Sequence, residues 1–410
     1  MKICMLCYRA NPFCGGQGIY LKYVAEAFAR QGHKVHAVVG PPFPEHMEGV
    51  VVHQVPNNEY YVKKKKDVIN PHAPFDIFNP LNFYQYFNSR FSTFPEISGF
   101  SYRAFLKIRE LHRSEQFDVI HDNQCLGYGL LLMKSLGIPV VATIHHPLTI
   151  DLENVIERAS SFTNKIKGVM FYPTVMQKIV SKRLDHVITV SEDSKEKIHY
   201  AFGVPRERQT VVYNGLDTSL FSPGKDVRKK KGKMIFVGNV EDGKKGFVYL
   251  LRALKHIKSD AFLTVIDGGA PHRKLTAQMI QFLGIENRVE FAGKVDTDGL
   301  IQHYRESELA IVPSVYEGFG FPAAEAMACG VPVIASDGGA LPEVVGNAGI
   351  VVPSRDEKGM ARAIDTAFND RDTLQRMGNE GRARVVEMFN WDDAAARMIT
   401  VFEKTISEKT

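Results

Sequence analysis

The chain of 410 residues is long enough for two or three domains of ordinary size. Its hydrophobic content of 44% and charged content of 24% are typical of a soluble globular protein, and a formal net charge of +5 gives no indication of nucleic-acid binding. Five cysteines without the spacing of a disulfide framework, and the lack of an apolar run long enough to span a bilayer, favour a cytoplasmic protein.

The first predicted elements form a strand–helix–strand unit. Apolar runs predict strands at residues 2–8 and 35–39, with a helix at 19–31 between them. The loop before the helix contains Gly15 and Gly16, which would let backbone N–H groups come close to a ligand. This loop lacks the G-x-G-x-x-G pattern of dinucleotide-binding proteins, which argues against an NAD-dependent oxidoreductase.

Residues 57–105 interrupt the alternation of strands and helices. Four consecutive lysines at 63–66 precede a passage rich in Phe and Tyr, and its prolines argue against one long helix. Two interpretations stay open. The segment packs on the first domain with its lysines solvated, or it forms an acceptor site or a peripheral contact with the inner face of a membrane. Lysines attract anionic headgroups, and aromatic rings favour the interface.

Regular α/β structure is then predicted to resume. Strands are expected at 118–121 and 139–143, a long helical region at 153–184, and the last main strand of the first domain at 185–191. His145 directly follows the second of these strands. The carboxyl ends of parallel strands are where open α/β sheets bind ligands, so His145 is a candidate site residue, with His146 as its competitor.

A linker rich in turn residues and lysines at 218–233 leads to a second predicted sheet. The first strand, at 234–237, is followed by Lys245 and Gly246, and a strand at 289–293 is followed by Val295. Both positions lie after strand ends, where a nucleotide would bind.

The segment 309–346 carries the strongest signal. A buried strand at 309–312 leads into a loop with two glycines, and Pro322 marks the first turn of a short helix. Backbone N–H groups at such a helix start favour an anion such as a phosphate. Glu317 in the loop and Glu325 in the helix can face one cleft, where carboxylates would accept hydrogen bonds from sugar hydroxyls.

Glu317 and Glu325, separated by seven residues, resemble the E-x7-E motif of the retaining GT-B glycosyltransferases of family 4. Lys245 resembles the family's Lys-Gly pair and His145 its Thr-x-His position, whereas Asn239 stands where the family has arginine. The resemblance continues through Ala328, Gly330, Pro332, Val333, Gly338, Gly339, Pro342 and Glu343. One family histidine, two residues after His121, is replaced by Asn123 here.

The resemblance implies the α/β GT-B fold, in which two Rossmann-like doubly wound domains face a central cleft. Residues 1–214 would form the acceptor-side domain, with a C-terminal helix at 393–410 folded back onto it. Residues 215–392 would form the domain that binds the nucleotide sugar.

The resemblance also implies roles for individual residues. Glu317 and His145 would contact the donor sugar, and Lys245 the leaving diphosphate, so these three are the predicted catalytic residues. Glu325 would accept hydrogen bonds from the ribose hydroxyls. The predicted substrate-binding residues are Gly15, Gly16, Gly318, Phe319, Gly320, Phe321, Glu325 and Val295.

The implied reaction moves a sugar from a nucleoside-diphosphate sugar to an acceptor hydroxyl with retention of configuration. A UDP-sugar is the favoured donor and a GDP-sugar the second choice, and the acceptor is a glycan, a glycolipid or a small molecule. No metal, other cofactor or nucleic-acid partner is expected. Two alternatives stay open: a non-catalytic protein that binds sugar nucleotides, and a phosphorylase or glucan synthase of the same fold.

Overall fold

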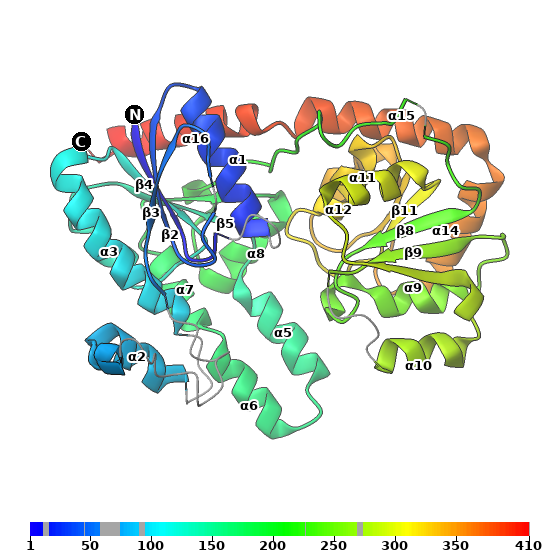
Figure 1. Ribbon diagram of the computed structural model, residues 1–410, viewed down its shortest axis with the longest axis horizontal. Coiled ribbons are helices and arrows are strands. Elements are labelled where there is room, and N and C mark those ends of the chain that lie inside the picture. The colour runs from blue at the N-terminus through cyan, green and yellow to red at the C-terminus, as the bar shows by residue number, and fades with distance from the viewer. Residues whose placement is uncertain are drawn as a thin grey trace. The chain divides into compact units, whose positions relative to one another are not determined.

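The computed structural model describes residues 1–10, 16–44, 46–57, 74–89, 95–225, 227–268 and 274–409. The chain divides into two compact units. The N-terminal unit comprises Met1–Val190, Ser194–Val212 and Trp391–Thr410, and the C-terminal unit comprises Ser191–Asp193 and Tyr213–Asn390. In each unit helices cover a parallel β-sheet (Figure 1).

The N-terminal sheet has seven parallel strands in the order β3-β2-β1-β4-β5-β6-β7. Most of its strands are buried on both faces, which explains why they read as continuous apolar runs rather than as alternating patterns. The strands are β1 (Lys2–Cys7), β2 (Lys34–Val39), β3 (Val50–Gln54), β4 (Val119–Asn123), β5 (Val140–Ile144), β6 (His186–Thr189) and β7 (Gln209–Val211).

The helices of this unit, apart from α16 at the end of the chain, connect the strands in chain order. They are α1 (Gly16–Arg30), η2 (Pro74–Phe78), α2 (Pro80–Ser89), α3 (Glu96–Glu115), α4 (Gly129–Lys134), α5 (Leu148–Arg158), α6 (Phe162–Phe171), α7 (Thr174–Ser181), α8 (Glu192–Phe202), η3 (Arg206–Arg208) and α16 (Trp391–Ser407).

Two predictions for this unit are wrong in detail. The helical region expected at 153–184 is three helices, because Ser161 caps the start of α6 and Pro173 precedes α7 in place of a continuing turn. The segment 185–191, predicted as the last main strand, is also followed by one more, short strand. β7 pairs with β6 beyond it, and its three residues are too short to give a periodic signal.

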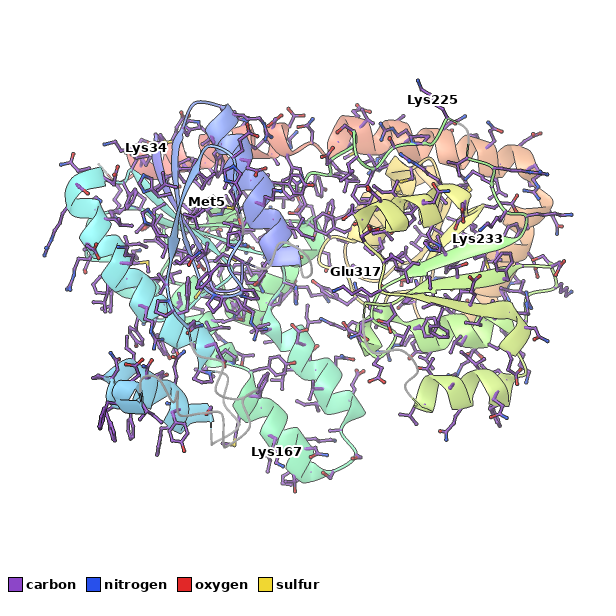
Figure 2. All side chains as sticks on the ribbon, in the orientation of Figure 1. Met5, Lys34, Lys167, Lys225, Lys233 and Glu317 are labelled. Carbon is purple, nitrogen blue, oxygen red and sulfur yellow. The ribbon has the colours of Figure 1, made fainter. Side chains whose placement is uncertain are left out.

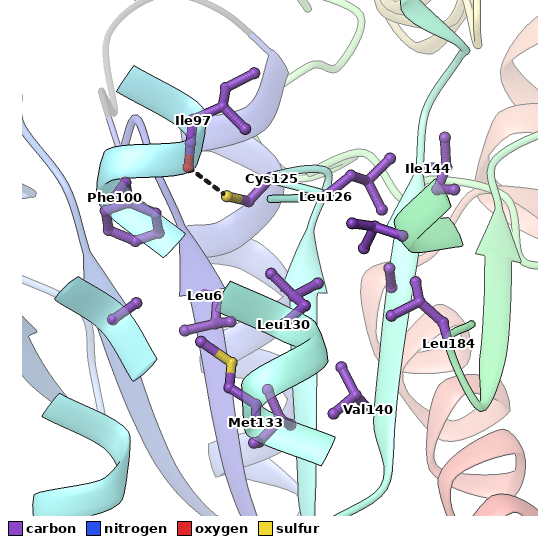
Figure 3. Packing of buried hydrophobic residues seen from close by; sticks show 14 of the residues in the cluster. Leu6, Ile97, Phe100, Cys125, Leu126, Leu130, Met133, Val140, Ile144 and Leu184 are labelled. Atoms are coloured by element: carbon purple, nitrogen blue, oxygen red, sulfur yellow. Dashed lines mark hydrogen bonds between the residues drawn. The ribbon is translucent and has the colours of Figure 1, made fainter. Parts of the chain in front are cut away.

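One hydrophobic core cluster of this unit lies between the sheet and a layer of helices that includes α3 and α4 (Figure 3). Leu6, Phe100, Leu130 and Val140 are fully buried there. Each large apolar side chain contributes about 1.5–3 kcal/mol on burial. Gly129 lets α4 approach α3 closely, since a Cβ atom at this position would lie 2.1 Å from a backbone oxygen of α3. This packing fixes the chain that follows β4.

The C-terminal sheet has six parallel strands in the order β10-β9-β8-β11-β12-β13. Its strands are β8 (Lys233–Val237), β9 (Phe262–Ile266), β10 (Val289–Gly293), β11 (Leu309–Val312), β12 (Val333–Ser336) and β13 (Ile350–Val352). Its helices are η4 (Gly243–Lys245), α9 (Phe247–Leu254), α10 (Lys274–Leu283), η5 (Glu286–Arg288), α11 (Thr297–Glu306), α12 (Phe321–Ala328), α13 (Leu341–Val345), η6 (Gly346–Ala348), α14 (Glu357–Asn369) and α15 (Arg371–Met388).

Both sheets reverse their strand order beside a central strand. The reversal lies between β1 and β4 in the first sheet and between β8 and β11 in the second. The crevice outside the carboxyl ends of such strands is where doubly wound sheets bind ligands. The predicted fold of two Rossmann-like units is therefore confirmed.

The helix α16 belongs to the N-terminal unit, although it follows the whole C-terminal unit in sequence. Trp391 stacks on Tyr23 with ring centroids 5.6 Å apart, and Phe402 packs on Phe28 at 5.7 Å. Both partners lie on α1, so the returning helix is packed into this unit through aromatic side chains. None of the helices in the described ranges has the length and apolar character needed to cross a membrane.

Candidate active site

Glycines shape the loop that follows β11. A Cβ atom on Gly338 would lie 2.1 Å from the backbone oxygen of Ser314, and one on Gly339 would lie 2.2 Å from that of Glu317. Gly339 also has a φ of +64°, which disfavours any larger residue. The N–H of Ala340 donates a hydrogen bond to the Glu317 carbonyl oxygen at 2.9 Å. The two glycines therefore let the β12–α13 connection hold the Glu317 loop in place.

The carboxylate of Glu317 is the centre of a small polar cluster. Its Oε1 atom accepts hydrogen bonds from Lys245 Nζ and from Ser314 Oγ, each at 2.8 Å. The side chains of Glu317 and Lys245 are 11% and 25% exposed, so the ion pair is partly shielded from water. Figure 2 labels Glu317 in the C-terminal unit. A cation and an anion are thus held together beyond the carboxyl ends of β8 and β11, where the strand order reverses.

Lys245 is positioned by the turn after β8. Gly246 has a φ of +64° and touches the β11 loop so closely that a Cβ atom there would lie 1.9 Å from the Pro313 oxygen. The N–H of Val315 donates to the Lys244 carbonyl oxygen at 2.6 Å. The two loops at the reversal point are locked together by backbone contacts, which fixes the distance between Lys245 and Glu317.

Glu325 lies one turn into α12 and faces Tyr304 of α11. The Tyr304 hydroxyl donates to Glu325 Oε2 at 2.9 Å, and Tyr304 is 1% exposed. Burial raises the pKa of Glu325 to about 7, while the tyrosine hydrogen bond and the charge of Lys245 lower it. Some of the residue's surface is nevertheless exposed, so one side of it can meet a ligand.

The loop that leads into α12 has a backbone conformation at Gly320 that favours glycine. Gly320 has a φ of +107°, and Phe319 is buried against Phe321 and Phe389 at centroid distances of 5.1 and 5.2 Å. The Gly318 carbonyl oxygen accepts a hydrogen bond from the Ser191 hydroxyl at 2.8 Å. Because the Phe319 ring is committed to the core, only its backbone is available to a ligand.

Two further predicted residues lie at the edges of the site. Val295 is half-buried in the connection between β10 and α11. Gly16 is the exposed first residue of α1 and has open space where a side chain would project. Gly15 lies outside the described residues.

His145 follows β5 and is held by the neighbouring strand end. Its ring Nε2 atom lies 2.8 Å from Asn123 Oδ1. Its backbone N–H donates to Gln124 Oε1 at 2.7 Å. Burial lowers the pKa of His145 to about 3, so the imidazole is neutral at physiological pH. The alternative candidate, His146, instead contacts Asp151 at 2.9 Å.

Three of the residues that build these sites were not predicted from the sequence. Ser314 stands three residues before Glu317 in the same loop, so its proximity could have been inferred. Tyr304 comes from a separate helix, and no local spacing indicates its contact with Glu325. Asn123 attracted notice only as a departure from the family pattern. Within the described ranges, no cluster of three or more His, Cys, Asp or Glu side chains could hold a metal ion.

Comparison with known families matches both halves of the chain. Residues 14–220 match the family model described as Glycosyltransferase Family 4. Residues 219–384 match the model described as Glycosyl transferases group 1, and this range includes Lys245, Glu317 and Glu325.

One individual relative is similar in sequence, and two solved structures are similar in fold. The chain is 34% identical over 417 residues to the "MMP alpha-(1->4)-mannosyltransferase" of Mycolicibacterium hassiacum, covering 99% of each protein. The sucrose-phosphate synthase from Thermosynechococcus elongatus has a similar structure, with a TM-score of 0.76, 23% identity and full coverage of both chains. Anabaena Alr3699/HepE, determined in complex with UDP and glucose, gives a TM-score of 0.70 at 19% identity, over 98% of this chain and 100% of that one.

Proposed function

The chain belongs to glycosyltransferase family 4 and is a glycosyltransferase, and from this premise we propose that it transfers a hexose from a nucleoside-diphosphate sugar to an acceptor hydroxyl with retention of configuration and without a metal ion. The observation that carries the proposal is the cluster of Lys245, Glu317 and Ser314 beyond the carboxyl ends of β8 and β11.

This cluster matches the chemistry of a sugar nucleotide. A sugar presents hydroxyl donors, which a carboxylate accepts, and a diphosphate presents anionic oxygens, which an ammonium group binds. An ion pair that is partly shielded from water gives up solvation of both charges. A ligand that carries donors and anionic oxygens side by side supplies partners for Glu317 and Lys245 together.

We propose that Lys245 and the backbone N–H groups at the start of α12 stabilise the charge that develops on the leaving diphosphate. Prearranged donors at such a position commonly lower a reaction barrier by several kcal/mol. Transfer should therefore continue when EDTA is present. Complete loss of activity with EDTA, restored by Mg²⁺ or Mn²⁺, would contradict the metal-independent mechanism.

The donor is proposed to be a UDP-sugar, with a GDP-sugar as the second choice. The HepE complex with UDP and glucose supports the first, whereas the 34% identical relative, a mannosyltransferase by name, supports a mannosyl donor. A thermal-shift panel of UDP-, GDP- and ADP-linked glucose and mannose separates these donors, because a ligand that binds only the folded protein raises its melting temperature.

In the N-terminal unit, we propose that His145 contacts the donor sugar and that Gly16, with Gly15, brings backbone N–H groups to the diphosphate. The support for His145 is its place after β5 and its neutral state, which lets it accept a hydrogen bond from a sugar hydroxyl. The open space beside Gly16 supports close approach of a ligand to its backbone.

We also propose that the N-terminal unit contacts anionic membrane surfaces from the cytoplasmic side. The four lysines at 63–66 lie outside the described residues, but the elements beyond them carry exposed aromatic rings, with Phe75 and Phe78 80% and 71% exposed. In the same unit, α6 exposes 77% of Phe162 and carries Lys165 and Lys167 without an acidic residue (Figure 2). Exposed rings beside lysines suit the boundary between headgroups and acyl chains.

Turnover distinguishes this function from its alternatives. Incubation with the stabilising donor should release nucleoside diphosphate, slowly with water and faster with a suitable acceptor among glycans, glycolipids and small polyols. Donor binding without any release would favour the non-catalytic sensor. Consumption of a sugar 1-phosphate or extension of a glucan would identify a phosphorylase or a glucan synthase.

A further inference from the structure

We propose that Asn123 is a positioning residue, which fixes the tautomer and orientation of His145 and ties that histidine to the first turn of α1. This inference rests on the proposed function, in which His145 contacts the donor sugar, and extends it to a residue that departs from the family pattern. Asn123 is the last residue of β4 and is fully buried.

The hydrogen bonds of Asn123 leave one arrangement for its amide. Its Nδ2 atom lies 2.8 Å from the carbonyl oxygen of Gln17, in the first turn of α1. A carbonyl oxygen only accepts hydrogen bonds, so the NH₂ group must face Gln17 and the Oδ1 atom must face His145. Since Oδ1 also only accepts, the His145 Nε2 atom, 2.8 Å away, must carry a hydrogen.

The tautomer of His145 follows from this arrangement. A neutral imidazole with hydrogen on Nε2 has a lone pair on Nδ1. In the part of the chain that the structure describes, no hydrogen bond reaches Nδ1. Nδ1 is thus the ring atom with which His145 can accept a hydrogen bond from a sugar hydroxyl.

The surroundings of His145 hold its backbone as well as its ring. Gln124 accepts from the His145 N–H at 2.7 Å and donates to the His146 carbonyl oxygen at 2.7 Å. The Ser194 hydroxyl donates to the His145 carbonyl oxygen at 2.8 Å. The edge-on ring of Tyr20, at a centroid distance of 4.8 Å and an angle of 87°, fills one side. Among these described contacts, the one with Asn123 determines which ring nitrogen carries the hydrogen.

Asn123 also couples two predicted donor-binding elements. Gln17 follows Gly16 directly, so the amide that orients His145 also holds the turn in which Gly16 presents its backbone. A single buried side chain at the end of β4 therefore sets the positions of both elements relative to the first sheet. This explains why an amide, which can donate and accept at once, suits this position.

The first test is spectroscopic and needs no substrate. In protein with ¹⁵N-labelled histidine, the His145 signal, one of 14 and identified by its loss in His145→Gln, should show hydrogen on Nε2 and a bare Nδ1. In Asn123→Leu, which has similar volume but no polar atoms, we expect a mixture of tautomers. A wild-type His145 with hydrogen on Nδ1 would overturn the proposal whether or not the protein proves to be a transferase.

The second test is kinetic. Asn123→Leu should lower kcat by about 10- to 100-fold, because it leaves the imidazole without its orienting partner, while the KM for the donor changes much less. In the His145→Ala background the same substitution should lower kcat much less, because only the contact of Asn123 with Gln17 is then left to lose. Full additivity of the two losses would contradict the positioning role.

A conservative variant separates the two contacts of Asn123. Asn123→Asp keeps an acceptor toward His145 but places a second oxygen against the Gln17 carbonyl. It should therefore retain the Nε2–H tautomer and lose less kcat than Asn123→Leu does. If Asn123→Leu fails to fold, this variant and the wild-type spectrum still decide the question. If the wild-type enzyme turns over and both variants have the same kcat as wild type, the positioning role of Asn123 is refuted. The proposed function is then left intact.

Discussion

Lys245 and Glu317 neutralise each other before any donor arrives. Each is therefore expected to change partner when a sugar nucleotide binds, with Lys245 turning to phosphate oxygens and Glu317 to sugar hydroxyls. The geometry that permits this exchange is provided by glycines, because Gly246 and Gly339 allow backbone contacts that a Cβ atom would block. Residues with no chemical function of their own thus control the distance between the two charges.

Glu317→Ala tests this arrangement most directly. Removal of a charged acceptor from sugar hydroxyls typically costs about 1.5–3 kcal/mol for each hydrogen bond, so we expect kcat/KM to fall about 100-fold or more. The measurement is nucleoside diphosphate release at several donor concentrations. Glu286→Ala, which removes an exposed carboxylate of the same unit, is the matched control and should stay within about twofold of wild type. A Glu317→Ala enzyme with near wild-type kcat/KM would refute the site assignment.

The raised pKa of Glu325 predicts that donor binding depends on pH. Its pKa is about 7, and in the proposed role the ionised carboxylate accepts hydrogen bonds from both ribose hydroxyls, whereas protonation turns one of its oxygens into a donor. Affinity should therefore rise with pH up to about 7 and then level off, with a limiting slope of about tenfold per pH unit below 7. His145 does not interfere, because its pKa is about 3.

Calorimetric titration of the donor between pH 5.5 and 8 measures this dependence. The intact sugar nucleotide is the right ligand, since its diphosphate is esterified at both ends and does not titrate in this range. Glu325→Gln should bind weakly and show a flat profile. A flat wild-type profile would mean that Glu325 does not contact the ribose in its ionised form.

At the scale of elements, α6 is largely exposed, since only Gly168 of its ten residues is buried. The helix packs against α5 at Gly168, where an added Cβ atom would lie 3.1 Å from the Val155 side chain. Its Phe162, Ile166 and Val169 are spaced so that they share one exposed face. An apolar stripe that its own unit leaves exposed suits an interfacial helix better than a core helix.

Vesicle flotation tests the membrane proposal. Wild-type protein should float with anionic vesicles at low salt and detach at high salt, because each lysine near the surface contributes about 1 kcal/mol, which salt screens. Changing the lysines at 63–66 to Ser, or Phe162, Lys165 and Lys167 of α6 to Ser, should reduce binding. Phe282→Ser, which removes an exposed ring from α10 of the other unit, is the control and should change nothing. Equally poor flotation of all proteins would direct the search for the acceptor to soluble molecules.

The elements that the sequence predicted well are those with a strong local signal. β1, β8 and β11 were predicted to within about one residue because uninterrupted apolar runs have few other uses in a soluble protein. The breaks around α6 were missed because a serine cap and a proline within a periodic apolar region are weak signals. The contact between Tyr304 and Glu325 could not be predicted at all, since it depends on how α11 packs beside α12 and not on spacing along the chain.

At the scale of the whole molecule, the N-terminal unit depends on a helix supplied from far along the sequence. Fragment 1–212 would lack α16 and would expose Tyr20, Phe28 and the face of α1 that carries them. We expect this fragment to melt at a lower temperature than the N-terminal unit of the intact protein and to bind a hydrophobic dye. Adding a peptide of residues 391–410 should reverse both effects. A fragment as stable alone as in the full chain would contradict this view.

Phe402→Ala is the matched substitution in the intact chain. Truncation of a fully buried Phe typically costs about 3–5 kcal/mol, so the melting transition of the N-terminal unit should move to lower temperature. Ser407→Ala, at the end of the same helix and exposed, should leave it unchanged. Equal melting temperatures for wild type and Phe402→Ala would show that α16 contributes little to this unit.

The return of α16 also sets an order of events on the ribosome. Val212 leaves the peptidyl-transferase centre about 180 residues before Trp391 does, which corresponds to roughly 10–35 s at ordinary elongation rates. During that interval the nascent N-terminal sheet has its strands but not its last helix, and the aromatic face of α1 is open to chaperones. The C-terminal unit, contiguous apart from Ser191–Asp193, can fold first. The part of the chain that is made first is therefore the part that is finished last.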